Sequence, residues 1–263
     1  MVELLLIKII VSIAVVIGLS LLAERISTRF AGVLLGYPIA TGIIMFFLGV
    51  EQGPKFAAQT SIWAINGLVA EIIFFIFYYF GIKYIKKFAI IGAMLLSTAG
   101  FFVSSLILRN LPLNSRFISS ILVLAFIIIA VFIFKGIKVK QISNPVKFSH
   151  KVLFIRAIFA TGMILFITGF AKILGPIWSG ILTSFPINAP VILILIQYHY
   201  KREDVLTLIK GKPIGTVSLL IFLLSVSYFF LMYGVYLGIL LSYILATAYL
   251  LIYEFFIKNK FNI

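Results

Sequence analysis

Apolar runs of about 20 residues follow one another along most of the chain, and a helix needs this length to cross the hydrocarbon core of a bilayer. Inside a bilayer every backbone polar group must be paired, so only helices or closed barrels can span it. The alternating segments of about ten residues that are typical of barrel strands are missing from the sequence. The sequence therefore predicts an all-α, polytopic integral membrane protein.

We expect nine transmembrane helices, with prolines, glycines and charges in the loops between them. They cover roughly residues 3–23, 31–50, 60–80, 88–108, 117–135, 151–171, 178–198, 213–233 and 236–257. The longest connection, from Lys135 to Lys151, is rich in lysine and indicates a hinge between two halves. The expected units are residues 1–114, a linking helix with its basic loop at 115–150, and residues 151–263. The first run has no cleavage site before Glu24-Arg25, so we expect a retained helix and not a signal peptide.

Charged residues make up 11% of the chain, whereas soluble domains carry about 25%. The net charge is +15, but basic residues of such membrane proteins collect in cytoplasmic loops, so the expected partner is the bilayer and not a nucleic acid. If the loops alternate between two sides, one side receives five of the 22 basic residues and the other receives seventeen (22 − 5). The five are Lys8, Lys55, Arg109, Arg116 and Lys172. This bias predicts an inner-membrane protein with its N-terminus outside and its C-terminus in the cytoplasm.

A segment with glycine and proline occurs twice, as residues 32–44 and again as residues 180–192. Pro38 and Pro186 align at an offset of 148 residues (186 − 38), and so do four other identical pairs: Gly32 with Gly180, Leu34 with Leu182, Ile39 with Ile187, and Ile44 with Ile192. At this offset the first four helices correspond to the last four, with one linking helix left over. An odd number of crossings separates the copies, and the basic residues change loops between them. We therefore expect two inverted four-helix repeats.

Three stretches of the first half carry a family resemblance: Leu5 to Glu24, Ala31 to Pro38, and Ser61-Ile62-Trp63. They are similar to the small four-helix GlpM-type membrane proteins of bacteria, which are about the size of one half of this chain. The resemblance implies a tandem fusion of two such units, joined by the linking helix, and it implies no particular activity. The chain departs from the family at Glu24, where a basic residue is usual, whereas Lys172 keeps one in the second copy.

The two proline segments are candidates for a substrate or ion site. Each proline removes a backbone donor and frees the carbonyl four residues earlier, which belongs to Leu34 or Leu182. Transporters built from inverted repeats place their sites at interrupted helices near the middle of the membrane. The residues expected at this site are Tyr37, Pro38, Thr41, Thr183, Ser184, Pro186, Asn188 and Pro190. The alternative is a pair of kinks that serve packing only.

Three ionisable residues are further candidates for the site. Glu71 falls near the middle of the third helix, where a charge costs at least about 2.5 kcal/mol, so we expect it to be buried against protein. It is either a coupling carboxylate or a protonated structural acid. Lys8 and Arg156 coincide at the same offset, near the start of the first helix of each half. They either guide an anionic substrate or lipid phosphate, or extend to the headgroups.

The sequence favours a secondary transporter or permease for a small solute or ion, which alternates its access about two proline-kinked helices. This expectation rests partly on analogy with other inverted-repeat carriers. The alternatives are a non-transporting assembly protein of the cell envelope and a lipid-handling protein. The sequence contains no catalytic carboxylate pair, nucleophile–histidine set, phosphate loop or metal-ligand spacing, so we expect neither an enzyme nor a cofactor or metal. It holds no signal of the oligomeric state.

Overall fold

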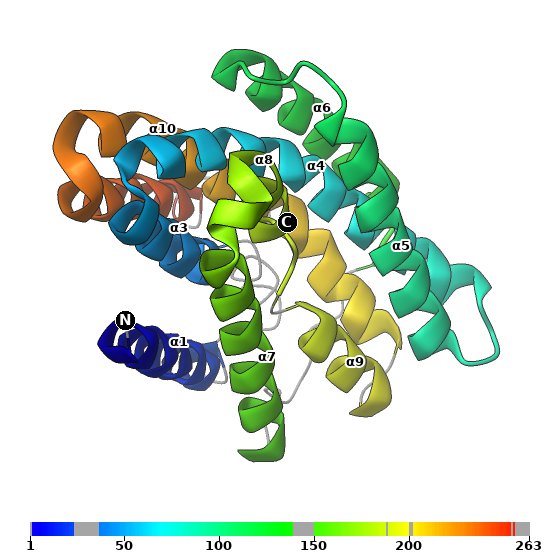
Figure 1. Ribbon diagram of the computed structural model, residues 1–263. Helices are drawn as coiled ribbons and strands as arrows, with labels where there is room; N and C mark the ends of the chain where they lie inside the picture. Colours follow the sequence, from blue (N-terminus) through cyan, green and yellow to red (C-terminus); the bar gives the residue numbers. More distant parts are fainter. Residues whose placement is uncertain are drawn as a thin grey trace.

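The computed structural model describes residues 2–23, 37–138, 150–187, 189–199, 202–253 and 255. These residues form helices and connections, with no strand among them. The helices are α1 (Val2–Ala23), α3 (Ile39–Gln52), α4 (Pro54–Tyr84), α5 (Ala89–Arg109), α6 (Arg116–Phe134), α7 (His150–Gly169), α8 (Ala171–Thr183), α9 (Ala189–His199) and α10 (Arg202–Ile252), shown in Figure 1. Four of them, α4, α5, α6 and α10, are long and apolar enough to cross a membrane. The prediction of an all-helical protein is confirmed for the described residues. The four long apolar helices fit a membrane protein.

Helix α4 lies at the centre of the bundle and packs against α3, α5, α6, α8 and α10 (Figure 1). Small buried residues along it, including Ala57, Ala64, Gly67 and Ala70, allow neighbouring backbones to approach closely. Only Gly53 separates α3 from α4, in place of the predicted loop of residues 51–59. Gly53 has a φ of +90°, which side chains other than glycine rarely adopt, and Pro54 follows at the first helical position.

Large apolar side chains cover the outer faces of the bundle. On α5, α6 and α10 these exposed residues include Leu95, Phe102, Ile121, Phe132 and Leu240. In water such surfaces would be unfavourable, but hydrocarbon chains solvate them well. The outward apolar faces therefore agree with the hydropathy of the four long helices.

Two predicted boundaries in the second half are wrong. The expected continuous helix over residues 178–198 is broken, because α8 ends at Thr183 and α9 begins at Ala189. The expected loop of residues 199–212 is mostly helical, since α10 begins at Arg202, eleven residues before the predicted start at 213. Its charges resembled a loop, but Lys212 is buried inside the bundle. Helix α10 also changes direction at Gly234, where φ is +74°.

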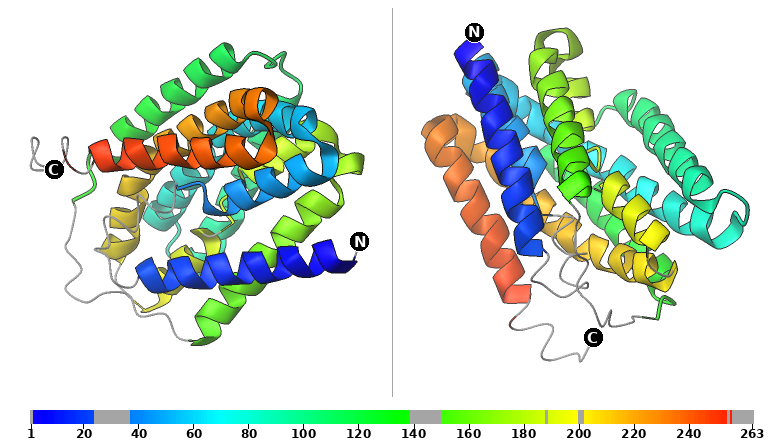
Figure 2. Two further views of the ribbon diagram at one scale, coloured as in Figure 1. Left: turned by 90° about the vertical axis from the view of Figure 1, so that its left-hand side faces the viewer. Right: turned by 90° about the horizontal axis from the view of Figure 1, so that it is seen from below.

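Helices α1 and α7 correspond in sequence at the offset of 148 residues, since residues 2–23 correspond to residues 150–171. Helices α1 and α7 lie side by side and run in opposite directions (Figure 2). Corresponding helices of the two halves are therefore neighbours of opposite direction at this position.

Candidate functional site

Both proline segments form the same tight turn. Pro38 has φ −73° and ψ 52°, close to an inverse γ-turn, and the Ile39 N–H donates to the Tyr37 carbonyl at 2.7 Å. In the second segment the Ile187 N–H donates to the Phe185 carbonyl, also at 2.7 Å, across Pro186. The two turns are 148 residues apart (186 − 38). We call them the first break, Tyr37-Pro38, and the second break, Ser184 to Ile187.

The second break interrupts its helix more completely than the predicted kink. The carbonyl of Leu182 was expected to be free, but it accepts the Phe185 N–H at 3.0 Å. Pro190 is buried at the second position of α9, where a helix tolerates proline. Two other candidates, Leu34 and Asn188, lie outside the described residues.

The two breaks meet beside α4. The Thr41 hydroxyl, in the first turn of α3, is 3.4 Å from the carbonyl of Thr183 at the end of α8. The Ser184 hydroxyl donates to the carbonyl of Ala64 in α4 at 2.6 Å. The candidate residues of both proline segments are thus brought together, although they are 142 residues apart in the case of Thr41 and Thr183.

Polar groups surround the first break. The Tyr243 hydroxyl, from the second part of α10, donates to the Pro38 carbonyl at 3.0 Å. One turn further along α10, Thr247 shares a 2.7 Å hydrogen bond with the Tyr37 hydroxyl. Gly42 makes this approach possible, because a Cβ atom there would collide with the Tyr243 hydroxyl. The second part of α10 therefore holds the turn at Tyr37-Pro38 in place.

Phenyl rings surround the second break. The Phe185 ring packs edge-on against Phe101 of α5, with centroids 5.0 Å apart, and against Phe74 of α4 at 6.2 Å. Phe102 of α5 stacks on it at 6.4 Å. At the offset of 148 residues, α5 corresponds to the second part of α10 (237 − 89). The segments that hold the two breaks, α5 and the second part of α10, therefore correspond at the same offset as the breaks themselves.

Glu71 forms a buried ion pair beside the second break. Its Oε1 lies 2.7 Å from Nζ of Lys212 in α10, and the two side chains are 3% and 2% exposed. The Lys212 ammonium also lies 5.1 Å from the centre of the Phe75 ring. The expected burial of Glu71 against protein is found, and the sequence reasoning missed its partner because it assigned Lys212 to a loop.

The position of Glu71 follows from the face of α4 that meets the second break. One turn earlier, Gly67 packs so closely that a Cβ atom there would be 2.9 Å from Ser184 Cβ. One turn later, Phe74 meets Phe185. Residues 67, 71 and 74 share one helix face. The carboxylate therefore lies between the two contacts that α4 makes with the broken segment.

Lys8 lies away from the two breaks, and the role expected of Arg156 stays a prediction. Lys8 is buried, lies 2.5 Å from Glu51 and donates to Thr168 of α7 at 2.9 Å, so it does not extend to the headgroups. Glu51 is near the far end of α3, roughly 20 Å along the helix from Pro38. Arg156 is also buried, about 18 Å along α7 from Thr168. The two basic residues are therefore at different ends of α7.

The described residues contain no cluster of three or more histidine, aspartate or glutamate side chains that could hold a metal ion. Comparisons of the chain with protein-family models, curated proteins and solved structures found no match. The resemblance to GlpM-type proteins therefore stays a prediction, and the site must be interpreted from its own geometry.

Proposed function

We propose that the protein is a secondary transporter for a small solute, with the Glu71–Lys212 ion pair as its coupling group. The observation that carries this proposal is the location of the pair, which is buried beside a broken helix in an apolar bundle. Interrupted helices at membrane depth are where transporters of this architecture bind their ligands. Ionisable residues at that depth are costly and are usually retained for a function.

The chemistry of coupling follows from the cost of a lone buried charge. Glu71 and Lys212 stabilise each other only while both are charged and in contact, and either one alone would be strongly unfavourable. A proton bound by Glu71 removes the attraction and leaves a positive charge on Lys212. An anionic group of the solute, or movement of α10 away from α4, then relieves that charge. Proton binding and access to the site would thus be linked.

The proposed frame has nine spans in two inverted repeats, with the N-terminus outside and the C-terminus in the cytoplasm. Its support is the pair of matching γ-turns at one offset and the opposite directions of the neighbouring helices α1 and α7.

Matched cysteines test the inverted frame. Lys55 and Glu203 are exposed and correspond at the offset of 148 residues (203 − 55). The chain has no native cysteine, so Lys55→Cys and Glu203→Cys can be labelled singly in intact cells with an impermeant maleimide. We expect only Lys55→Cys to react before the cells are opened. Equal labelling of both from outside would refute the inverted repeats.

Transport is tested in proteoliposomes that contain a trapped pH dye, with a panel of radiolabelled amino acids, sugars, organic acids and amines. We expect at least one solute to move protons in the wild type. The double variant Glu71→Gln/Lys212→Met removes both charges, so it should remain folded and lose proton movement. The matched control is Lys8→Met/Glu51→Gln, which neutralises the other buried ion pair and should retain coupling.

Two results would contradict the proposal. Proton movement that survives in Glu71→Gln/Lys212→Met would exclude this pair as the coupling group. A folded wild-type protein that moves no solute and copurifies with a fixed partner would favour the assembly role instead. The lipid-handling role receives no support from Lys8, because its charge is already compensated by Glu51.

A further inference from the structure

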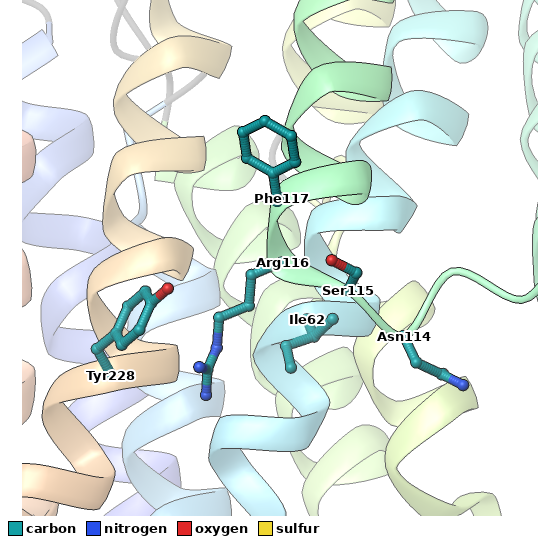
Figure 3. A pocket seen from close by; sticks show the side chains of 6 residues that line it. All are labelled: Ile62, Asn114, Ser115, Arg116, Phe117 and Tyr228. Atoms are coloured by element: carbon teal, nitrogen blue, oxygen red, sulfur yellow. The ribbon is translucent and has the colours of Figure 1, made fainter.

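Two adjoining cavities open at one end of the bundle, between α4, α6 and α10, far from the proline breaks in sequence. One has a volume of about 460 Å³ and is lined by Ile62, Asn114, Ser115, Arg116, Phe117 and Tyr228 (Figure 3). The other has a volume of about 320 Å³ and shares Ile62 and Arg116 with the first. Arg116 thus borders both cavities.

The Arg116 side chain is held in place between the cavities. Its Nη2 donates to the Ser227 carbonyl at 2.9 Å, and its guanidinium lies 4.2 Å from the centre of the Tyr228 ring. Figure 3 shows the side chain extending between Tyr228 and Ile62. Its Nε is buried and has no hydrogen-bond partner among the described residues. A guanidinium fixed in this way presents a rigid, planar group of N–H donors, which suits a planar or tetrahedral oxyanion.

The charges of the lining favour an anion. Lys55 lines the second cavity together with Gln59, and no carboxylate is among the described residues that line either cavity. Asn114 and Ser115 contribute further polar groups on the other side of Arg116. The two cavities are therefore lined by two basic side chains and several polar ones, with no acidic side chain among the described lining residues.

The rim of the cavities is apolar and faces outward. Phe117 is 74% exposed, and Tyr228 and Leu231 are about half exposed. These residues belong to α6 and α10, two of the helices long and apolar enough to cross a membrane. A ligand here would have its charged part at Arg116 and an apolar part along the bundle surface. That combination describes a phospholipid.

We propose that the cavities bind the phosphate group of an anionic phospholipid, with the phosphate between Arg116 and Lys55 and the acyl chains along Phe117 and Leu231. This site is separate from the proposed transport site and does not depend on it. By the charge bias it lies at the outer surface, where basic residues are few.

Native mass spectrometry of the protein released from phosphatidylglycerol nanodiscs tests the proposal. We expect one retained lipid in the wild type and roughly tenfold weaker retention in Arg116→Gln, because a charge-assisted hydrogen bond is lost. Arg116→Lys keeps the positive charge but loses the planar guanidinium. Its lipid retention should therefore lie between those of the wild type and Arg116→Gln. Lys55→Gln should also weaken retention. The matched control is Arg109→Gln, which removes a basic residue that stacks on Trp178 and lines neither cavity.

Equal retention by wild type and Arg116→Gln, or an equal loss in Arg109→Gln, would overturn the assignment. A second arm adds inorganic phosphate at millimolar concentration. Persistence of the lipid supports the phospholipid, whereas complete displacement by inorganic phosphate would replace it with a free oxyanion. Thermal unfolding of each variant shows that it is folded, so a loss of lipid is not a loss of structure.

Discussion

The first and second breaks have the same backbone turn but different surroundings. Hydroxyl groups of Tyr243 and Thr247 hold the first break, whereas the second break combines one hydroxyl bond, from Ser184 to Ala64, with the phenyl rings of Phe74 and Phe101. A hydrogen bond can be exchanged for one to water at little net change in free energy, but a packed phenyl cluster must first be separated. The difference suggests that the first break opens to water more readily than the second. The same backbone turn is therefore held by contacts of different kinds at the two positions.

The largest expected effect concerns the ion pair beside the second break. At the offset of 148 residues, Glu71 corresponds to Leu219 and Lys212 to Ala64, so the equivalent positions are apolar. Lys212→Met leaves the Glu71 carboxylate buried without its partner and should lower the free energy of unfolding by about 3–5 kcal/mol. Unfolding by sodium dodecyl sulfate measures this change. The double variant Glu71→Leu/Lys212→Met should lie much closer to the wild type, and an equal loss in both would contradict the pairing.

Gly42→Ala should have the next largest effect, at the first break. The added Cβ atom would overlap the Tyr243 hydroxyl, and such overpacking costs about 1–3 kcal/mol. The loss should appear in the same unfolding titration, and Gly42→Ala/Tyr243→Phe should recover part of it, because the hydroxyl oxygen is the atom nearest to the added Cβ. Gly162→Ala in α7 is the control, because nothing lies within 4 Å of its added Cβ atom. A loss in the control as large as in Gly42→Ala would contradict the proposed overlap.

A smaller effect tests whether each break is held by a different helix, the first by the second part of α10 and the second by α5. Tyr243→Phe removes a hydrogen bond of about 1 kcal/mol and should speed maleimide labelling of a cysteine at Ala40 roughly fivefold. Labelling of a cysteine at Ala189 should not change. Phe101→Leu should do the reverse, with faster labelling at position 189 only. If either substitution speeds labelling equally at both positions, the two breaks are not held independently.

Thr41→Val should have the smallest effect. The contact between its hydroxyl and the Thr183 carbonyl is 3.4 Å long, and hydrogen bonds between membrane helices average about 0.6 kcal/mol. We expect a change of about 0.5 kcal/mol or less in the unfolding titration. Ser184→Ala, which removes a 2.6 Å bond to the Ala64 carbonyl, should cost more. The opposite order would show that the long contact joins the breaks more strongly than its geometry implies.

Local patterns in the sequence predict much of the fold and part of the site. The long apolar runs predict the helices, and Pro38 and Pro186 predict interruptions because proline lacks an N–H. The cost of a charge inside a membrane predicts that Glu71 is buried. Each of these predictions depends on physical chemistry that acts within a few residues of the chain.

The contacts that complete the site depend on tertiary packing and were not predicted. Lys212 follows several other charges, so its segment resembles a loop until the helix is seen to begin at Arg202. The bond from Tyr243 to Pro38 joins residues 205 positions apart, and nothing near either residue specifies the other. Lys8 showed the same limit, because its partner Glu51 was assigned to a loop.

The hydrogen bond between Tyr243 and Pro38 has a consequence for biosynthesis. Pro38 leaves the ribosome early, yet the hydroxyl that holds its carbonyl is synthesised 205 residues later. The first break therefore lacks this hydrogen bond until the last helix has been synthesised. During that interval an insertase or chaperone could shield the turn, and truncation before Tyr243 would leave a polypeptide that quality-control proteases recognise.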